Sequence, residues 1–121
     1  MTRLSLLAHG GCQIAEITGE DKAITSIEMI AGLMDEAIGL QADRLLANRG
    51  LIDESFFDVK SGFADQLVQR LKATNLRLAV TGEFSWVETL ALKAYLKKHG
   101  IEKQVFFAKA REAALDWLSQ G

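Results

Sequence analysis

The apolar residues of this chain follow two different periods, and segments of the two kinds alternate along the sequence. In segments 3–8 and 12–17 apolar and polar residues alternate, and Gly10-Gly11 separates the two segments. A period of two is typical of strands, and paired glycines tolerate the positive φ values of a tight turn. The chain is therefore predicted to open with a β-hairpin. Three further short apolar segments are predicted strands, at 42–48, 76–81 and 104–108.

Longer segments between these strands carry apolar residues three and four positions apart, which predicts helices. In the first of them an apolar stripe that includes Met34 and Ile38 follows a capping box formed by Thr25 and Glu28. Gly39 is expected to end this helix, because glycine readily takes the left-handed conformation found after many helix ends. The other three helices are predicted at 59–72, 85–100 and 111–118.

The predicted order of elements is β-β-α-β-α-β-α-β-α. Strands that alternate with helices indicate an α/β fold with a mostly parallel central sheet and helices on its faces. Only the N-terminal strand has to be antiparallel, because a two-residue turn joins it to the next strand. A length of 121 residues is typical of one domain, so the whole chain, 1–121, is expected to form a single domain.

Composition and charge argue against several classes of protein. Hydrophobic residues make up 49% of the chain and charged residues 25%, as in an ordinary globular protein. The net charge of −2, with acids and bases interspersed, lacks the basic stripe needed to bind a nucleic-acid backbone. Charges interrupt every apolar run well short of a membrane span, and no signal peptide is recognisable. With a single cysteine, Cys12, a cytoplasmic location is expected.

The core of the sequence resembles a small bacterial family without an assigned activity that has been placed in the STAS-like fold, the fold of the anti-sigma-factor antagonists. The residues that carry the resemblance are Phe56-Phe57-Asp58, Ser61-Gly62, Ala64, Gly82, Phe84-Ser85 and Phe106-Phe107. The resemblance implies a serine at the start of the second helix that is phosphorylated in the antagonists. The nearest match here is Ser61, which lies one residue further from Asp58 than the antagonist pattern requires.

Two groups of polar residues could carry a function in this segment. Ser61 is predicted at a helix N-terminus, where unpaired N–H groups and the helix dipole favour a phosphate, although serine is also common there as a local cap. Asp53, Glu54, Asp58 and Glu83 could meet where two loops converge at one end of the sheet. Asp58 is equally suited to cap the second helix, and the spacing of these acids matches no known metal-binding loop.

The remaining reactive side chains indicate no catalytic set. Ser85 is explained by a capping box with Glu88, and no histidine lies near it in sequence. His9, His99 and Cys12 lack the spacing of a zinc site. No glycine-rich phosphate-binding motif is present. We therefore expect no catalytic residues, no metal and no cofactor.

Two functions remain open from the sequence. The first is a non-enzymatic regulatory or protein-interaction module, with a protein partner or a second copy of the chain bound to a surface formed by Phe56, Phe57, Asp58, Ser61, Gly62 and Glu83. The second is a small-molecule-binding protein or an enzyme whose pocket lies at the sheet end, between loops 56–61 and 82–86. A concave pocket would favour the second function, because ligands of open α/β sheets often lie beyond the carboxyl ends of strands.

Overall fold

The computed structural model describes residues 3–19, 24, 27–52, 63–74, 76–83, 86–100 and 103–120. Its elements follow the predicted order, with one additional 3-10 turn, η1, after the third strand. They are β1 (Arg3–His9), β2 (Cys12–Thr18), α1 (Ile27–Gly39), β3 (Arg44–Asn48), η1 (Arg49–Leu51), α2 (Phe63–Ala73), β4 (Arg77–Thr81), α3 (Trp86–Lys98), β5 (Val105–Ala108) and α4 (Arg111–Leu118).

The five strands form one mixed sheet in the order of the chain, β1-β2-β3-β4-β5. β1 is antiparallel to β2, and each later neighbour is parallel. Gly10 and Gly11 join the first two strands with φ values of 58° and 80°, as a two-residue hairpin turn requires. The predicted α/β fold with an antiparallel N-terminal strand is confirmed.

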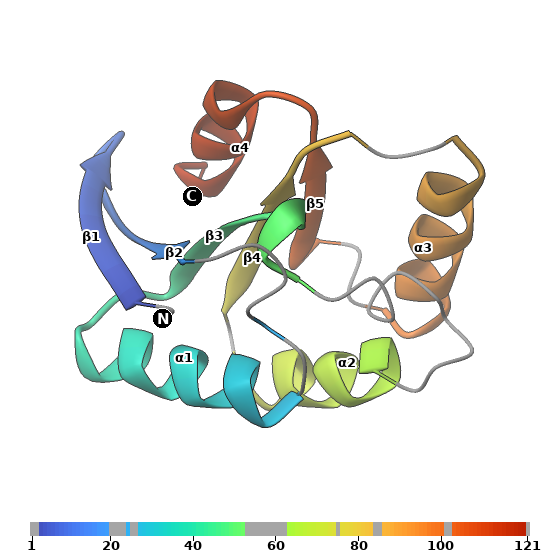
Figure 1. The fold of residues 1–121 in the computed structure, drawn as a ribbon, viewed down its shortest axis with the longest axis horizontal. Coiled ribbons are helices and arrows are strands. Elements are labelled where there is room, and N and C mark those ends of the chain that lie inside the picture. The colour runs from blue at the N-terminus through green and yellow to red at the C-terminus, as the bar shows by residue number, and fades with distance from the viewer. Residues whose placement is uncertain are drawn as a thin grey trace.

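The helices cover the two faces of the sheet unequally (Figure 1). Helices α1, α2 and α3 lie on one face, and α4 lies alone on the other, against β3, β4 and β5. This arrangement follows from the strand order, because right-handed crossovers between successive neighbouring strands place their helices on the same face. Within the described segments, no helix has the length and apolar character needed to cross a membrane.

Two separate cores result from the alternation of side chains along the strands. Leu45 and Val80 point into the larger core, under α1, α2 and α3, whereas Leu46 and Ala79 point into the smaller core under α4. All four side chains are buried. The prediction that 76–81 is a strand covered on both faces is therefore confirmed.

The apolar stripe of α2 is confirmed over its described side chains, since Leu67 and Leu71 are buried and Arg70 is exposed. The stripe predicted for α1 is correct at Met34, which is buried, but wrong at Ile38, which is exposed. The last turn of α1 reaches the amino edge of the sheet, where Ile38 borders an open hollow.

The end of α1 at Gly39 is confirmed, but glycine is not the residue that reverses the chain. Gln41 takes the left-handed conformation, with φ of 64°. The amide of Ala42 donates to the carbonyl of Ala37 and the amide of Gln41 to that of Ile38, both at 2.9 Å. This pair of hydrogen bonds is a Schellman motif, and its position was not evident from the glycine.

Polar contacts at the carboxyl end of α4 hold this helix against the sheet. The guanidinium groups of Arg44 and Arg77 donate to the carbonyls of Leu118, the last residue of the helix, and Gln120, just after it. At the hairpin, His9 Nε2 lies 3.1 Å from Asp116 Oδ1. The ring of Trp117 in α4 also stacks on Phe106 of β5 at 5.2 Å between centroids. Helix α4 is therefore bound to strands along the whole width of the sheet.

Candidate functional site

A hollow at the carboxyl edge of the sheet arises where β2 and β3 separate. The two strands pair from Ile14–Arg44 to Glu16–Leu46 and no further. β2 continues to Thr18 beside β1, while β3 continues to Asn48 beside β4. Beyond the last pair the ends of β2 and β3 no longer pair with each other. The structure therefore contains a fork between two parallel strands at their carboxyl ends.

This fork encloses an open hollow of about 390 Å³. Its walls come from the end of β2 on one side and from the end of β3 and η1 on the other, with Glu16 at the point where the strands divide. We call it the fork pocket, and it is lined by Glu16, Ile17, Thr18, Gly19, Asn48, Gly50 and Leu51. Its volume falls within the range of small-molecule sites in proteins, and its position is the usual one in open α/β sheets.

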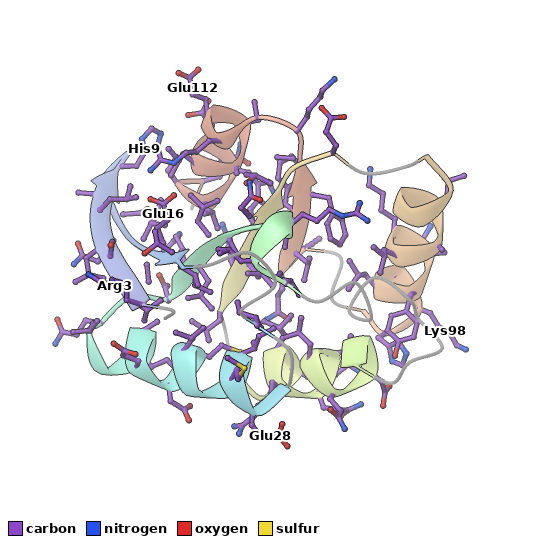
Figure 2. The ribbon with its side chains drawn as sticks, viewed as in Figure 1. Arg3, His9, Glu16, Glu28, Lys98 and Glu112 are labelled. Atoms are coloured by element: carbon purple, nitrogen blue, oxygen red, sulfur yellow. The ribbon has the colours of Figure 1, made fainter. Side chains whose placement is uncertain are left out.

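Among the described residues that line the fork pocket, Glu16 is the one that carries a charge. Its side chain is only 25% exposed and points toward α4 (Figure 2), where Arg111 holds it with two hydrogen bonds. Arg111 Nη2 donates to Oε1 at 2.9 Å and Nε donates to Oε2 at 3.1 Å. These hydrogen bonds, and the negative charge of Glu16, raise the pKa of Arg111 above its ordinary value. The pair holds the Glu16 carboxylate in place at the fork.

The opposite wall is ordered by Asn48. Its side-chain carbonyl accepts a hydrogen bond from the amide of Gly50 at 2.8 Å and so caps η1. Its side-chain amide lies 3.4 Å from Thr81 Oγ1, and that hydroxyl lies 3.5 Å from the carbonyl of Ala47. Thr81 is the one buried polar side chain found in the described part of the chain. The β3 wall is therefore shaped by side chains of two neighbouring strands.

Glu83 is the one member of the predicted interaction surface that the structure describes. It lies just after β4 and is exposed. Its backbone carbonyl accepts a hydrogen bond from Arg49 Nη1 at 2.8 Å, and its carboxylate lies 3.8 Å from Lys109 Nζ. Glu83 therefore lies at the carboxyl edge, as predicted for the sheet-end loops. Phe56, Phe57, Asp58, Ser61 and Gly62 lie outside the described residues, as do Asp53, Glu54 and Ser85.

The two histidines and the cysteine do not form one site. His9 and Cys12 face each other across the hairpin, and both contact the α4 end of the chain, Cys12 through Sγ at 3.6 Å from the carbonyl of Ser119. His99 lies at the end of α3, with its ring centroid 4.6 Å from that of Tyr95. The described residues contain no group of His, Cys, Asp and Glu that could hold a metal ion.

A second hollow, of about 430 Å³, lies at the amino edge of the sheet beside the hairpin. Its charged residues are already engaged with protein groups. Arg44 contacts Asp43 at 2.5 Å and donates to the carbonyl of Leu118, and Cys12 contacts the carbonyl of Ser119. The fork pocket lies instead at the carboxyl edge, the usual position for ligands of open α/β sheets, and is for that reason the better candidate for a ligand.

Sequence reasoning missed Glu16, Thr18, Asn48 and Arg111. Two local signals were present, because Glu16 is an acid between the apolar residues Ala15 and Ile17, and Asn48 directly follows a buried strand. The pairing of Glu16 with Arg111 joins residues 95 positions apart, and no local pattern reports such a contact.

Comparison with known proteins gives a family but no activity. The family model described as Domain of unknown function (DUF4180) matches residues 9–118. No curated protein and no solved structure matches the chain.

Proposed function

This chain belongs to the DUF4180 family, and from that starting point we propose that it is a small-molecule-binding module whose ligand occupies the fork pocket. The observation that carries the proposal is the early end of the β2–β3 ladder at Glu16–Leu46. A break between parallel strands opens a crevice at their carboxyl ends, which is the general ligand position of open α/β sheets.

The lining indicates a ligand that donates hydrogen bonds. Arg111 uses one acceptor position on each oxygen of Glu16, and a carboxylate has about four such positions. The remaining positions suit the hydroxyl or amino groups of a small polar molecule. Thr18, whose hydroxyl lies 3.5 Å from the carbonyl of Arg3, lines the same pocket, and Ile17 and Leu51 add apolar surface. A polyol, a sugar or a small amine combines these properties, whereas an anion would face the charge of Glu16.

Binding without catalysis is the role that this chemistry supports. Glu16 is held by Arg111, and no described serine, cysteine or histidine lines the fork pocket. Covalent catalysis needs a nucleophile within hydrogen-bond reach of a base, and such a pair is not found among the described lining residues. The pocket supplies one fixed carboxylate, which is enough to select and orient a ligand.

The test is a thermal-shift screen of the parent protein against small polyols, sugars, amino acids and amines. We expect at least one class of compound to raise the melting temperature of the parent, because a ligand that binds only the folded state stabilises it. Glu16→Gln keeps the size of the side chain but removes its charge, and Thr18→Val removes the hydroxyl. Both variants should lose most of the shift.

Glu36→Gln is the matched control, because Glu36 is an exposed acid on α1, across the sheet from α4. It should respond to the compound as the parent does. A screen without any stabilising compound would contradict the proposal, and so would a shift of equal size in Glu16→Gln, Thr18→Val and the parent.

A protein-interaction role is the second candidate function, with the STAS-like fold as its structural basis. Its support is the mixed sheet with an antiparallel first strand and the exposed Glu83, whose loop is held at the carboxyl edge by Arg49. A negative charge at Ser61, introduced by Ser61→Asp, should then weaken a complex that uses this surface. Proteins recovered with the parent and with the variant from the native cell would be compared. Equal recovery of every partner would exclude this surface.

A further inference from the structure

We propose that the outer edge of β1 is a dimerisation edge, and that it pairs with β1 of a second copy of this chain in antiparallel orientation. β1 is the first strand of the sheet and lies at its margin (Figure 1). Within the described segments, no strand pairs with its outer side. This inference concerns a different surface from the fork pocket and does not depend on the ligand.

The two edges of the sheet differ in their protection against such pairing. β5, at the far edge, has only the four residues Val105–Ala108, and Lys103 and Lys109 stand just before and after it. Short length and flanking lysines are the usual means by which proteins prevent edge strands from associating. β1 has seven residues with the sequence RLSLLAH, without lysine, proline or a bulge. Its Leu6 is 42% exposed.

The hairpin determines which backbone groups of β1 face outward. His9 and Cys12 flank the two-residue turn, so they form the hydrogen-bonded pair that closes it. Hydrogen-bonded residues alternate along an antiparallel strand, so the N–H and C=O groups of Arg3, Ser5 and Leu7 also point toward β2. Those of Leu4, Leu6 and Ala8 point away from the sheet. They are the groups that a further strand would use.

This alternation of backbone groups that point toward β2 and away from it favours one register of pairing between the two copies. If two β1 strands pair about Leu6, then Leu6 faces Leu6 of the second copy, and Leu4 faces Ala8 in both directions. Each of these pairs consists of residues whose backbone groups point outward, so all of them can exchange hydrogen bonds. All seven residues of β1 are then matched, from Arg3 opposite His9 through to His9 opposite Arg3. The result is a two-fold symmetric contact in which both copies use the same surface.

Side chains on both faces of the strand support the same register. Arg3 of the second copy lies opposite His9, whose ring contacts Asp116 at 3.1 Å. Asp116 is 73% exposed, so an incoming guanidinium can reach it, and the symmetry provides this pair of opposite charges twice. On the other face the two Leu6 side chains meet at the axis. The exposed Ile38 lines the same hollow as Gln13, and Gln13 is the β2 residue paired with Ala8.

The first experiment measures molar mass by size-exclusion chromatography with light scattering. The parent should have the mass of two chains. Leu6→Lys should have the mass of one, because it places two ammonium groups directly opposite each other at the axis. Leu90→Lys is the matched control, since Leu90 is 50% exposed on α3, on a different part of the surface, and this variant should remain a dimer. Circular dichroism checks that each variant is folded.

A charge exchange tests the register. Arg3→Glu should weaken the dimer because it faces Asp116, and the double variant Arg3→Glu with Asp116→Arg should restore it. Cross-linking provides a second readout that does not require a strong dimer. With Cys12→Ala as background, Leu6→Cys should form an intermolecular disulfide under mild oxidation, since hydrogen-bonded antiparallel partners lie about 5.5 Å apart. Ala8→Cys should not, because the two copies of residue 8 would be roughly 13 Å apart.

A parent that has the mass of one chain at every concentration and forms no Leu6→Cys disulfide would overturn the proposal. So would a dimer that survives Leu6→Lys, because its interface would then lie elsewhere. Equal cross-linking through Leu6→Cys and Ala8→Cys would overturn the register.

Discussion

Single residues at the hairpin turn connect the beginning of the chain to its end. Gly10 and Gly11 both have positive φ values, but their surroundings differ. A Cβ atom on Gly10 would lie 2.7 Å from Cβ of Ser119, whereas a Cβ on Gly11 would meet nothing within 4 Å. The backbone of Gly10 is thus in close contact with the residue that follows α4.

Replacing each glycine by alanine separates backbone strain from this contact. Gly11→Ala should lower the free energy of unfolding by roughly 1–2 kcal/mol, the cost of a left-handed conformation for a residue with a Cβ. Gly10→Ala has the same backbone cost and must also displace Ser119, so we expect it to lower the free energy of unfolding further than Gly11→Ala does. Chemical denaturation of the two variants and the parent measures both values. Equal losses would show that the end of the chain moves aside without cost.

At the scale of residues, two features could not be predicted from the sequence: the residue that reverses the chain after α1, and the pairing of Glu16 with Arg111. The end of α1 was predictable at Gly39, but the left-handed residue proved to be Gln41. The Schellman hydrogen bonds run from Ala42 to Ala37 and from Gln41 to Ile38, and this motif places its left-handed residue at Gln41, two positions after Gly39. Glu16 and Arg111 could not be paired in advance, since their contact depends on how α4 crosses the sheet.

At the scale of elements, α2 and α3 are connected by a hydrogen bond between side chains. The phenol of Tyr95 on α3 donates to Asp65 Oδ1 on α2 at 2.9 Å. Partial burial raises the pKa of Tyr95 above its ordinary value of 10.0, and the hydrogen bond to Asp65 and its negative charge act in the same direction. All of these effects favour the neutral phenol in the folded state.

The sign of the resulting pH dependence follows from linkage. Because the pKa is raised on folding, the contribution of Tyr95 to stability is complete below the unfolded pKa of about 10 and is lost as the pH rises through the folded value. Tyr95→Phe should therefore melt at a lower temperature than the parent near pH 8 and lose less stability than the parent as the pH rises above about 10.

Tyr95 is the single tyrosine of the sequence, so its ionisation can be followed directly by ultraviolet absorbance. The titration midpoint of the folded parent should lie above that of the unfolded chain, and Asp65→Ala should move it back toward the ordinary value. A midpoint that does not respond to Asp65→Ala would show that the hydrogen bond between α2 and α3 is not formed in solution.

Elements were predicted well where local pattern and burial agree. β4 has the consecutive apolar residues Leu78, Ala79 and Val80, whose side chains alternate between the two faces of the sheet. A continuous apolar run of this kind is typical of a strand in a sheet that is covered on both faces. The fork between β2 and β3 was not predictable in the same way. Apolar residues continue to Ile17 in β2 and to Ala47 in β3, and the position where their ladder ends depends on pairing with β1 and β4.

At the scale of the whole molecule, the two cores share one sheet. Leu46 belongs to the smaller core, whereas its neighbours Leu45 and Ala47 belong to the larger one. Loss of either core therefore disturbs strands that support the other. We expect the chain to unfold as one cooperative unit.

Leu118→Ala tests this expectation. Leu118 is fully buried in the smaller core, so its truncation should lower the free energy of unfolding by about 2–5 kcal/mol. In a Trp86→Phe background, fluorescence reports Trp117 of α4 alone, while circular dichroism reports all helices. The two denaturation curves should coincide in the parent and in the variant. A fluorescence transition that precedes the loss of helix would show that α4 detaches independently.

The solitary position of α4 has a consequence for synthesis of the protein. Among the described elements, α4 is the one that covers its face of the sheet, and it follows all the others along the chain. While the ribosome is still adding this segment, β1 to β4 can already assemble with α1, α2 and α3, but the opposite side of the sheet, including Ile14, Leu46 and Ala79, has no cover. A nascent chain of this protein therefore presents an exposed apolar surface until α4 emerges. Chaperones that recognise apolar surface are expected to bind this face during synthesis. A chain terminated before Arg111 would lack α4 and would leave the face uncovered.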